Sequence, residues 1–143
     1  MNKDIMHILV LFLDGIGLGE ADPDKNPFAV ADMPTVHRLT NGKRWLADTG
    51  TQQSEQAIFI PTDPRLGVEG RPQSGTGQAT ILTGLNVPQM IGRHYGPKPE
   101  AQTRDIIHEH SYFKRVVERG KKANLLTAYP PGLLHDFERG KTL

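Results

Sequence analysis

An acidic residue directly follows the most apolar stretch of the chain. Residues Ile5–Leu13 are almost continuously apolar, and Asp14 comes next, followed by the glycine-rich segment Gly15–Gly19. Continuous apolarity is typical of a strand covered on both faces, as in a parallel sheet. Ligands of such sheets bind at the carboxyl ends of the strands, so Asp14 is predicted to lie where a metal or a phosphate would bind. The alternative is that Asp14 only stabilises a turn.

Two hydroxyl side chains stand at the start of a predicted helix. The segment Arg71–Thr80 contains Ser74 and Thr76, and the pattern predicts a helix over Ser74–Thr83 that ends at Gly84. The backbone N–H groups and the dipole at a helix N-terminus favour anions. Near a metal ion, such a hydroxyl can attack phosphorus. An ordinary helix-capping role is the alternative for both residues.

The glycines after Asp14 do not form a nucleotide-binding fingerprint. The dinucleotide motif needs Gly-x-Gly-x-x-Gly opening a helix directly, whereas Gly15, Gly17 and Gly19 have a different spacing and Pro23 and Pro27 follow closely. The sequence also has no Gly-Lys-Ser/Thr of a phosphate-binding loop. Both observations argue against a nucleotide cofactor.

The elements that would position these residues alternate between strand and helix. This order predicts an α/β fold with a mostly parallel sheet and flanking helices. Few strands are recognisable for such a sheet, so residues 1–143 are interpreted as the N-terminal part of a single, incomplete domain. Besides Ile5–Leu13 and Ser74–Thr83, the expected elements are helices over Met33–Leu39, Pro99–His108 and Ser111–Arg119, a short strand over Ala57–Pro61 and a buried strand over Ala123–Ala128.

Composition restricts the class of protein further. The chain of 143 residues is 36% hydrophobic and 23% charged, which is typical of one globular domain. The formal net charge of +1, without a basic run, predicts neither a nucleic acid nor a membrane as partner. Cysteine is absent and the apolar run is too short to span a bilayer, so a cytoplasmic location is expected.

Four of the six histidines were considered as possible contacts for a metal or a phosphate. His7 lies within the predicted first strand and is expected to be a core residue. His108 and His110 are two residues apart, so they do not share a helical face, and a solvated surface pair is expected. His94, beside Arg93 in a glycine-flanked loop, is a candidate for contact with a bound phosphate.

Taken together, these residues resemble the alkaline phosphatase superfamily. The resemblance is carried by the segment Asp14–Gly17 and by the later segment Gln73–Gln78 with Thr83–Gly84. It is greatest to the branch of cofactor-independent phosphoglycerate mutases, phosphopentomutases and related metalloenzymes. The chain departs from that branch at Gln78, where the mutases have a histidine after the glycine, and this departure bears on mutase activity more than on the metal site.

The resemblance implies a metal-dependent enzyme that transfers or hydrolyses a phosphoryl group. Asp14 and Ser74 are implied as metal ligands. Ser74 is also implied as the catalytic nucleophile, and Thr76 is the second candidate for that role. The complete enzymes hold two divalent ions, manganese or zinc, and take most ligands from C-terminal motifs that this chain lacks. The implied substrate is a small phosphorylated molecule.

Two other interpretations remain open at this stage. The chain could be a non-catalytic module that binds phosphate or another anion at the Ser74 helix. It could also be one subunit of a split enzyme, with a missing C-terminal half or further copies of itself as partners, in which case it should expose an apolar sheet edge.

Overall fold

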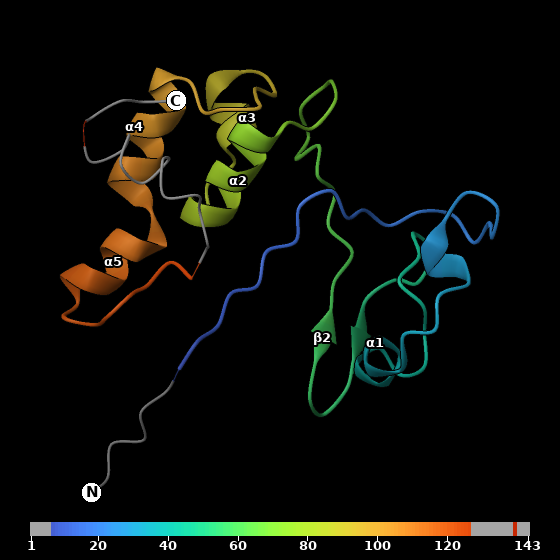
Figure 1. Ribbon diagram of the computed structural model, residues 1–143. Helices are drawn as coiled ribbons and strands as arrows, with labels where there is room; N and C mark the ends of the chain where they lie inside the picture. Colours follow the sequence, from blue (N-terminus) through green and yellow to red (C-terminus); the bar gives the residue numbers. More distant parts are fainter. Residues whose placement is uncertain (1–6, 127–138, 140–143) are drawn as a thin grey trace, which may run out of the picture. The chain divides into compact units, whose positions relative to one another are not determined.

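The chain folds into two compact units. A computed structural model describes residues 7–126 and residue 139, and the contacts divide the chain into Met1–Thr62 and Asp63–Leu143 (Figure 1). We call these the first and the second unit. The grouping of both into one domain stays a prediction.

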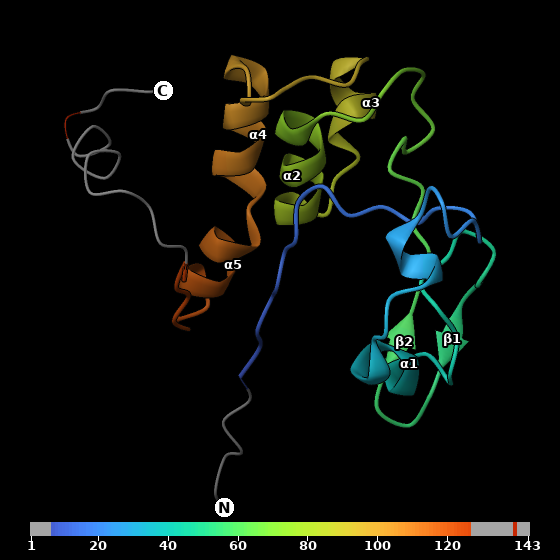
Figure 2. The same cartoon turned by 45° about the vertical axis from the view of Figure 1, so that its right-hand side comes forward.

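An aromatic cluster organises the first unit. The Trp45 ring stacks on Phe59 with 5.9 Å between ring centroids and meets the edge of Phe28 at 6.0 Å. Nearby, Arg44 Nη1 donates to the backbone carbonyls of Phe28 and Ala31, at 3.3 and 2.8 Å. The described elements of this unit are the 3-10 helix η1 (Pro27–Ala29), the helix α1 (Pro34–Leu39) and the antiparallel strands β1 (Gln52–Gln53) and β2 (Ile58–Phe59), which Figure 2 shows together.

Asn26 connects the glycine-rich segment to this cluster. Its side chain donates from Nδ2 to the Glu20 carbonyl at 2.8 Å and accepts from the Phe28 N–H at 3.1 Å, where it caps η1. Close by, the Lys25 ammonium bonds to Asp22 at 2.8 Å and, with the Asp24 N–H, lowers the pKa of the Asp22 carboxyl. Asn26 is buried, so its two hydrogen bonds are poorly replaced by water.

We expect Asn26→Ala to lower the free energy of unfolding of the first unit by about 2 kcal/mol, because one cap and one buried donor are lost together. Trp45 is the only tryptophan of the chain, so its fluorescence during urea denaturation reports on this unit. The control is Lys25→Ala, which removes an exposed ion pair and should leave the midpoint unchanged. Equal midpoint shifts for both variants would contradict the role given to Asn26.

The second unit is a small helical assembly. Its helices within the described residues are α2 (Ser74–Thr83), α3 (Val87–Ile91), α4 (Ala101–His110) and α5 (Tyr112–Glu118), and α2 packs against α3 and α4 (Figure 2). Three buried apolar side chains, one from each of α2, α3 and α4, form the core, and partly buried residues surround them. These core residues are Ala79, Val87 and Ile106.

The helix predictions for this unit are largely confirmed. The helix over Ser74–Thr83 has the expected bounds, and Gly84 ends it with φ of 74°. Ser111 caps α5 by accepting from the Lys114 N–H, as its position predicts. Helix α3, which contains Pro88, was not predicted from the sequence. Proline is tolerated in the first turn of a helix, and that is where Pro88 lies.

The predicted first strand does not take strand form in the described residues. Residues 7–13 have no regular secondary structure, and His7, expected in the core, is exposed. Of the expected strand Ala123–Ala128, residues 123–126 are irregular, and the last two residues lie outside the described part. A strand exists only with a hydrogen-bonded neighbour, and within the described ranges neither segment has one.

The sheet within residues 7–126 is the antiparallel pair β1–β2, and its short strands are joined by a tight hairpin. One isolated parallel bridge joins Gly19 to Leu46, with the Ala47 N–H donating to the Gly19 carbonyl at 2.8 Å. The mostly parallel α/β sheet therefore stays a prediction. In the part of the chain that the structure describes, every helix is too short or too polar to cross a membrane.

Candidate functional site

Ser74 is the first residue of α2. Gln73 adopts an extended conformation at the N-cap and contributes no side-chain cap. The Ser74 side chain is only partly buried, and its hydroxyl makes no hydrogen bond to the other described residues. A hydroxyl in this setting can donate its proton to a base or approach a bound ligand.

Thr76, two residues later, has a different environment. Its side chain is fully buried, and its hydroxyl accepts from the Tyr95 N–H at 3.2 Å and lies 3.4 Å from the Gln73 carbonyl. The Thr76 N–H in turn donates to the Tyr95 carbonyl at 3.0 Å. Thr76 therefore fastens the loop after α3 to the first turn of α2, which makes Ser74 the better candidate for chemistry.

The same loop approaches α2 closely at two glycines. A Cβ atom on Gly75 would lie 2.7 Å from the Tyr95 carbonyl oxygen and 3.0 Å from that of Lys98. A Cβ atom on Gly96 would lie 3.1 Å from the backbone nitrogens of Ser74 and Gly75. The Tyr95 carbonyl oxygen thus takes the Thr76 N–H, one of the backbone donors at this helix N-terminus that an anion would otherwise use.

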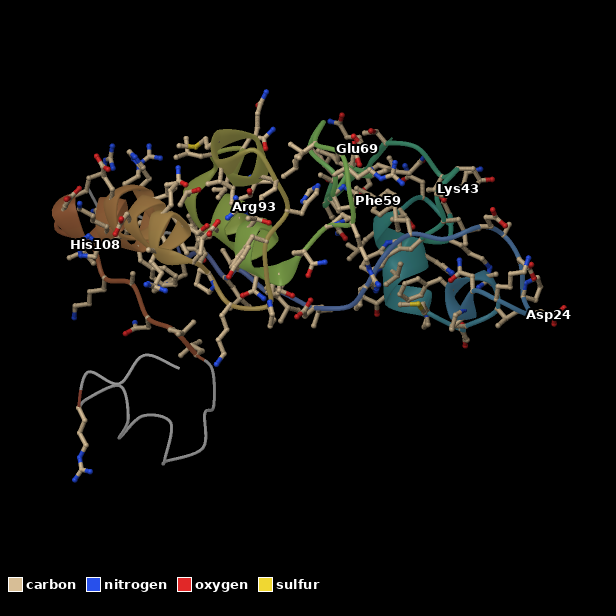
Figure 3. The ribbon with its side chains drawn as sticks, turned by 90° about the horizontal axis from the view of Figure 1, so that it is seen from above. Asp24, Lys43, Phe59, Glu69, Arg93 and His108 are labelled. Carbon is tan, nitrogen blue, oxygen red and sulfur yellow. The ribbon has the colours of Figure 1, made fainter. Side chains whose placement is uncertain are left out.

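Two basic side chains near the start of this loop contact other parts of the second unit, and Figure 3 labels one of them, Arg93. The Arg93 guanidinium bonds to both carboxylate oxygens of Glu100, at 2.9 and 2.7 Å, and lies 5.5 Å from the centre of the Tyr95 ring. His94 Nε2 lies 3.2 Å from the Val68 carbonyl. Both basic residues already have protein partners, so contact between His94 and a phosphate stays a prediction.

Asp14 lies in an exposed turn of the first unit. Its Oδ1 accepts from the N–H of Gly15 at 2.9 Å, and Gly15 has φ of 72°, a conformation that favours glycine. The other oxygen, Oδ2, has no hydrogen-bond partner among the described residues. The turn role considered for Asp14 is therefore present, and it leaves one carboxylate oxygen available to a cation.

The side chains of Asp14 and Ser74 are chemically suited to bind a divalent metal ion, but two ligands are fewer than such an ion needs. A carboxylate oxygen and a serine hydroxyl suit manganese and are acceptable to zinc, which takes about four ligands. Asp14 belongs to the first unit and Ser74 and Thr76 to the second, so their pairing at one site stays a prediction. Among the residues that the structure describes, no three His, Asp or Glu side chains are grouped to hold a metal ion.

The remaining histidines take no part in this arrangement. His108 is exposed on α4, and His110 lies 3.6 Å from Glu109, which agrees with the expected surface pair (Figure 3). The residues that sequence reasoning missed are Tyr95 and Lys98, whose backbone covers α2. A local signal did exist in the glycines at positions 75 and 96, since glycine in a helix or a loop often marks close backbone approach.

Comparison with models of protein families, with curated proteins and with solved structures finds no match to this chain.

Proposed function

We propose that this chain contributes a nucleophile and a metal ligand to a metal-dependent phosphoryl-transfer or phosphate-ester-hydrolysing enzyme. The observation that carries the proposal is the contrast between two neighbouring hydroxyls. Thr76 is buried and bonded to Tyr95, whereas the Ser74 hydroxyl at the helix start is partly exposed and has no described partner. Asp14, with one uncommitted carboxylate oxygen, is the proposed metal ligand of the chain.

In this proposal Ser74 Oγ forms a bond to phosphorus and the substrate alkoxide leaves with a proton. The phosphoseryl group then passes to water, which gives hydrolysis, or to another hydroxyl, which gives transfer. A bound manganese or zinc ion would polarise the phosphoryl oxygens and favour loss of the Ser74 proton. The further ligands of such an ion would come from residues other than Asp14 and Ser74.

The test uses the full product of the gene that encodes this sequence, with 4-nitrophenyl phosphate and either manganese or zinc. We expect activity that a chelator abolishes, that Ser74→Ala lowers by at least ~1000-fold and that Asp14→Asn lowers strongly. Mass spectrometry after acid quenching should find phosphate on Ser74 in the wild type. Thr51→Ala, which removes an exposed hydroxyl elsewhere, is the control and should keep full activity.

Activity that survives both the chelator and Ser74→Ala would refute the proposal, as would the absence of any metal-dependent activity. The non-catalytic alternative predicts a different result, namely phosphate binding without metal in a calorimeter.

A further inference from the structure

One asparagine of the chain stands in the sequence context where an asparagine side chain reacts most easily with its own backbone. Asn41 is followed by Gly42, whereas the other asparagines precede lysine, proline, valine or leucine. In this reaction the backbone nitrogen of the next residue attacks the side-chain amide carbon. Glycine hinders the attack least because it has no side chain, and proline has no N–H to give up. Asn41 is therefore the position where the reaction is chemically easiest.

The fold engages both reacting groups with other partners. Asn41 and Gly42 follow α1, and Asn41 has φ of 53°, in the left-handed region that asparagine tolerates. The Gly42 N–H donates to the His37 carbonyl at 2.6 Å. The Asn41 side chain donates from Nδ2 to the Gln53 carbonyl at 2.9 Å. Because the attack requires these hydrogen bonds to break, the closed turn after α1 opposes it.

A buried hydroxyl holds this turn closed. Thr40, directly before Asn41, is only 2% exposed. Its Oγ1 lies 2.9 Å from the Val36 carbonyl oxygen and 2.5 Å from that of Lys43, so it joins the backbone on both sides of Asn41 and Gly42. The Lys43 N–H also donates to the Thr40 carbonyl at 3.0 Å. All these contacts lie within the first unit, and their loss frees the reacting groups.

We propose that Asn41 is a site of spontaneous deamidation, which the folded first unit suppresses and which opening of the turn after α1 permits. The Gly42 nitrogen forms a bond to Asn41 Cγ, the bond from Cγ to Nδ2 breaks, and the Gly42 proton leaves with the amide nitrogen as ammonia. Water then opens the cyclic imide and gives aspartate or its β-linked isomer at position 41. The reaction needs only water, and it does not depend on the phosphoryl-transfer activity.

The product cannot restore the original turn. An aspartate carboxylate at position 41 has no proton to donate to the Gln53 carbonyl, and the two oxygens repel each other. The β-linked isomer also adds a methylene group to the backbone of a turn that places the Gly42 N–H on the His37 carbonyl. A first unit that has opened long enough to react therefore closes less firmly afterwards, and the modification makes that opening irreversible.

Peptide mass spectrometry of the 143-residue chain, incubated in mildly alkaline buffer with and without urea, follows the conversion of amide to acid at position 41. We expect the reaction to be at least ~10-fold slower in buffer than in urea, because only the opened fraction reacts. A synthetic peptide of residues 38–44 reports the effect of urea on the chemistry itself, by which the ratio is corrected. Over the same period Asn86 and Asn124 should remain amides, because valine and leucine follow them.

Thr40→Val tests the part that the turn plays in the folded protein. Without the hydroxyl, we expect deamidation in buffer to be at least ~5-fold faster than in the wild type. Thr35→Val, which changes an exposed threonine of α1, is the matched control and should react like the wild type. Trp45 fluorescence checks that both variants are folded, and if Thr40→Val is not, the wild-type comparison decides. Equal corrected rates in buffer and urea, equal rates for the two folded variants, or no reaction in urea overturns the proposal.

Discussion

Gly75→Ala is expected to lower the free energy of unfolding of the second unit by about 2 kcal/mol. The new Cβ atom would stand 2.7 Å from the Tyr95 carbonyl oxygen and 3.0 Å from that of Lys98. Both atoms belong to the backbone, so relief requires the loop or α2 to move, at a cost of about 1 to 3 kcal/mol for such overpacking. The higher helix propensity of alanine offsets part of this cost.

Gly77→Ala provides the matched control two residues further along α2. A Cβ atom there would meet nothing within 4 Å, and Gly77 has an ordinary negative φ. Here the gain in helix propensity is unopposed, so stability should rise by about 0.5 to 1 kcal/mol. Urea denaturation followed by far-ultraviolet circular dichroism measures the stability of both variants. The signal reports on the second unit, because α2 to α5 hold most of the helical residues that the structure describes. A Gly75→Ala variant as stable as Gly77→Ala would contradict the packing described for the loop.

Thr76→Val is expected to lower the free energy of unfolding of the second unit by about 1 to 2 kcal/mol. Valine keeps the shape of threonine but offers a methyl group to the Tyr95 N–H, which is then left without its acceptor. Because Thr76 is fully buried, water cannot take the place of the hydroxyl. The amide hydrogen of Tyr95 should also exchange faster with solvent, and NMR can follow that exchange.

Ser74→Ala is the control for this second prediction. The Ser74 hydroxyl has no hydrogen-bond partner among the described residues, so its removal should change stability by less than about 0.5 kcal/mol. The Tyr95 exchange rate should stay at the wild-type value. If Ser74→Ala destabilised the unit as much as Thr76→Val, the assignment of Thr76 as the structural hydroxyl and Ser74 as the catalytic candidate would be wrong.

Apart from α3, the α-helices in the described residues were predictable because their signals are local. Proline at the start of α1, Gly84 after α2 and Ser111 before α5 each act within one turn of the helix that they begin or end. Helix capping and backbone φ preferences need no distant partner, so the local amino-acid sequence is enough to predict where a helix begins and ends. The short strand β2 was also expected, within the segment Ala57–Pro61.

The extended segments were harder to predict because a strand depends on a neighbour. The composition of Ile5–Leu13 predicts a buried strand, yet residues 8–13 are exposed and unpaired within the described chain. Apolar composition indicates that a segment is suited to the interior of a sheet, but it does not show that neighbouring strands are present to pair with it. The same reasoning applies to Leu125 and Leu126, which are apolar and exposed.

The sequence alone determined where α2 begins and ends and that hydroxyls stand in its first turn. Only the tertiary structure decided that the Thr76 hydroxyl bonds to Tyr95 and that Gly75 lies under the 95–98 backbone. It also decided that the Ser74 hydroxyl has no hydrogen-bond partner among the described residues. The physical reason is the range of the interactions. Capping acts between residues a few positions apart, whereas the contacts that separate Ser74 from Thr76 come from a loop about twenty residues away, brought there by packing of α2 against α3 and α4.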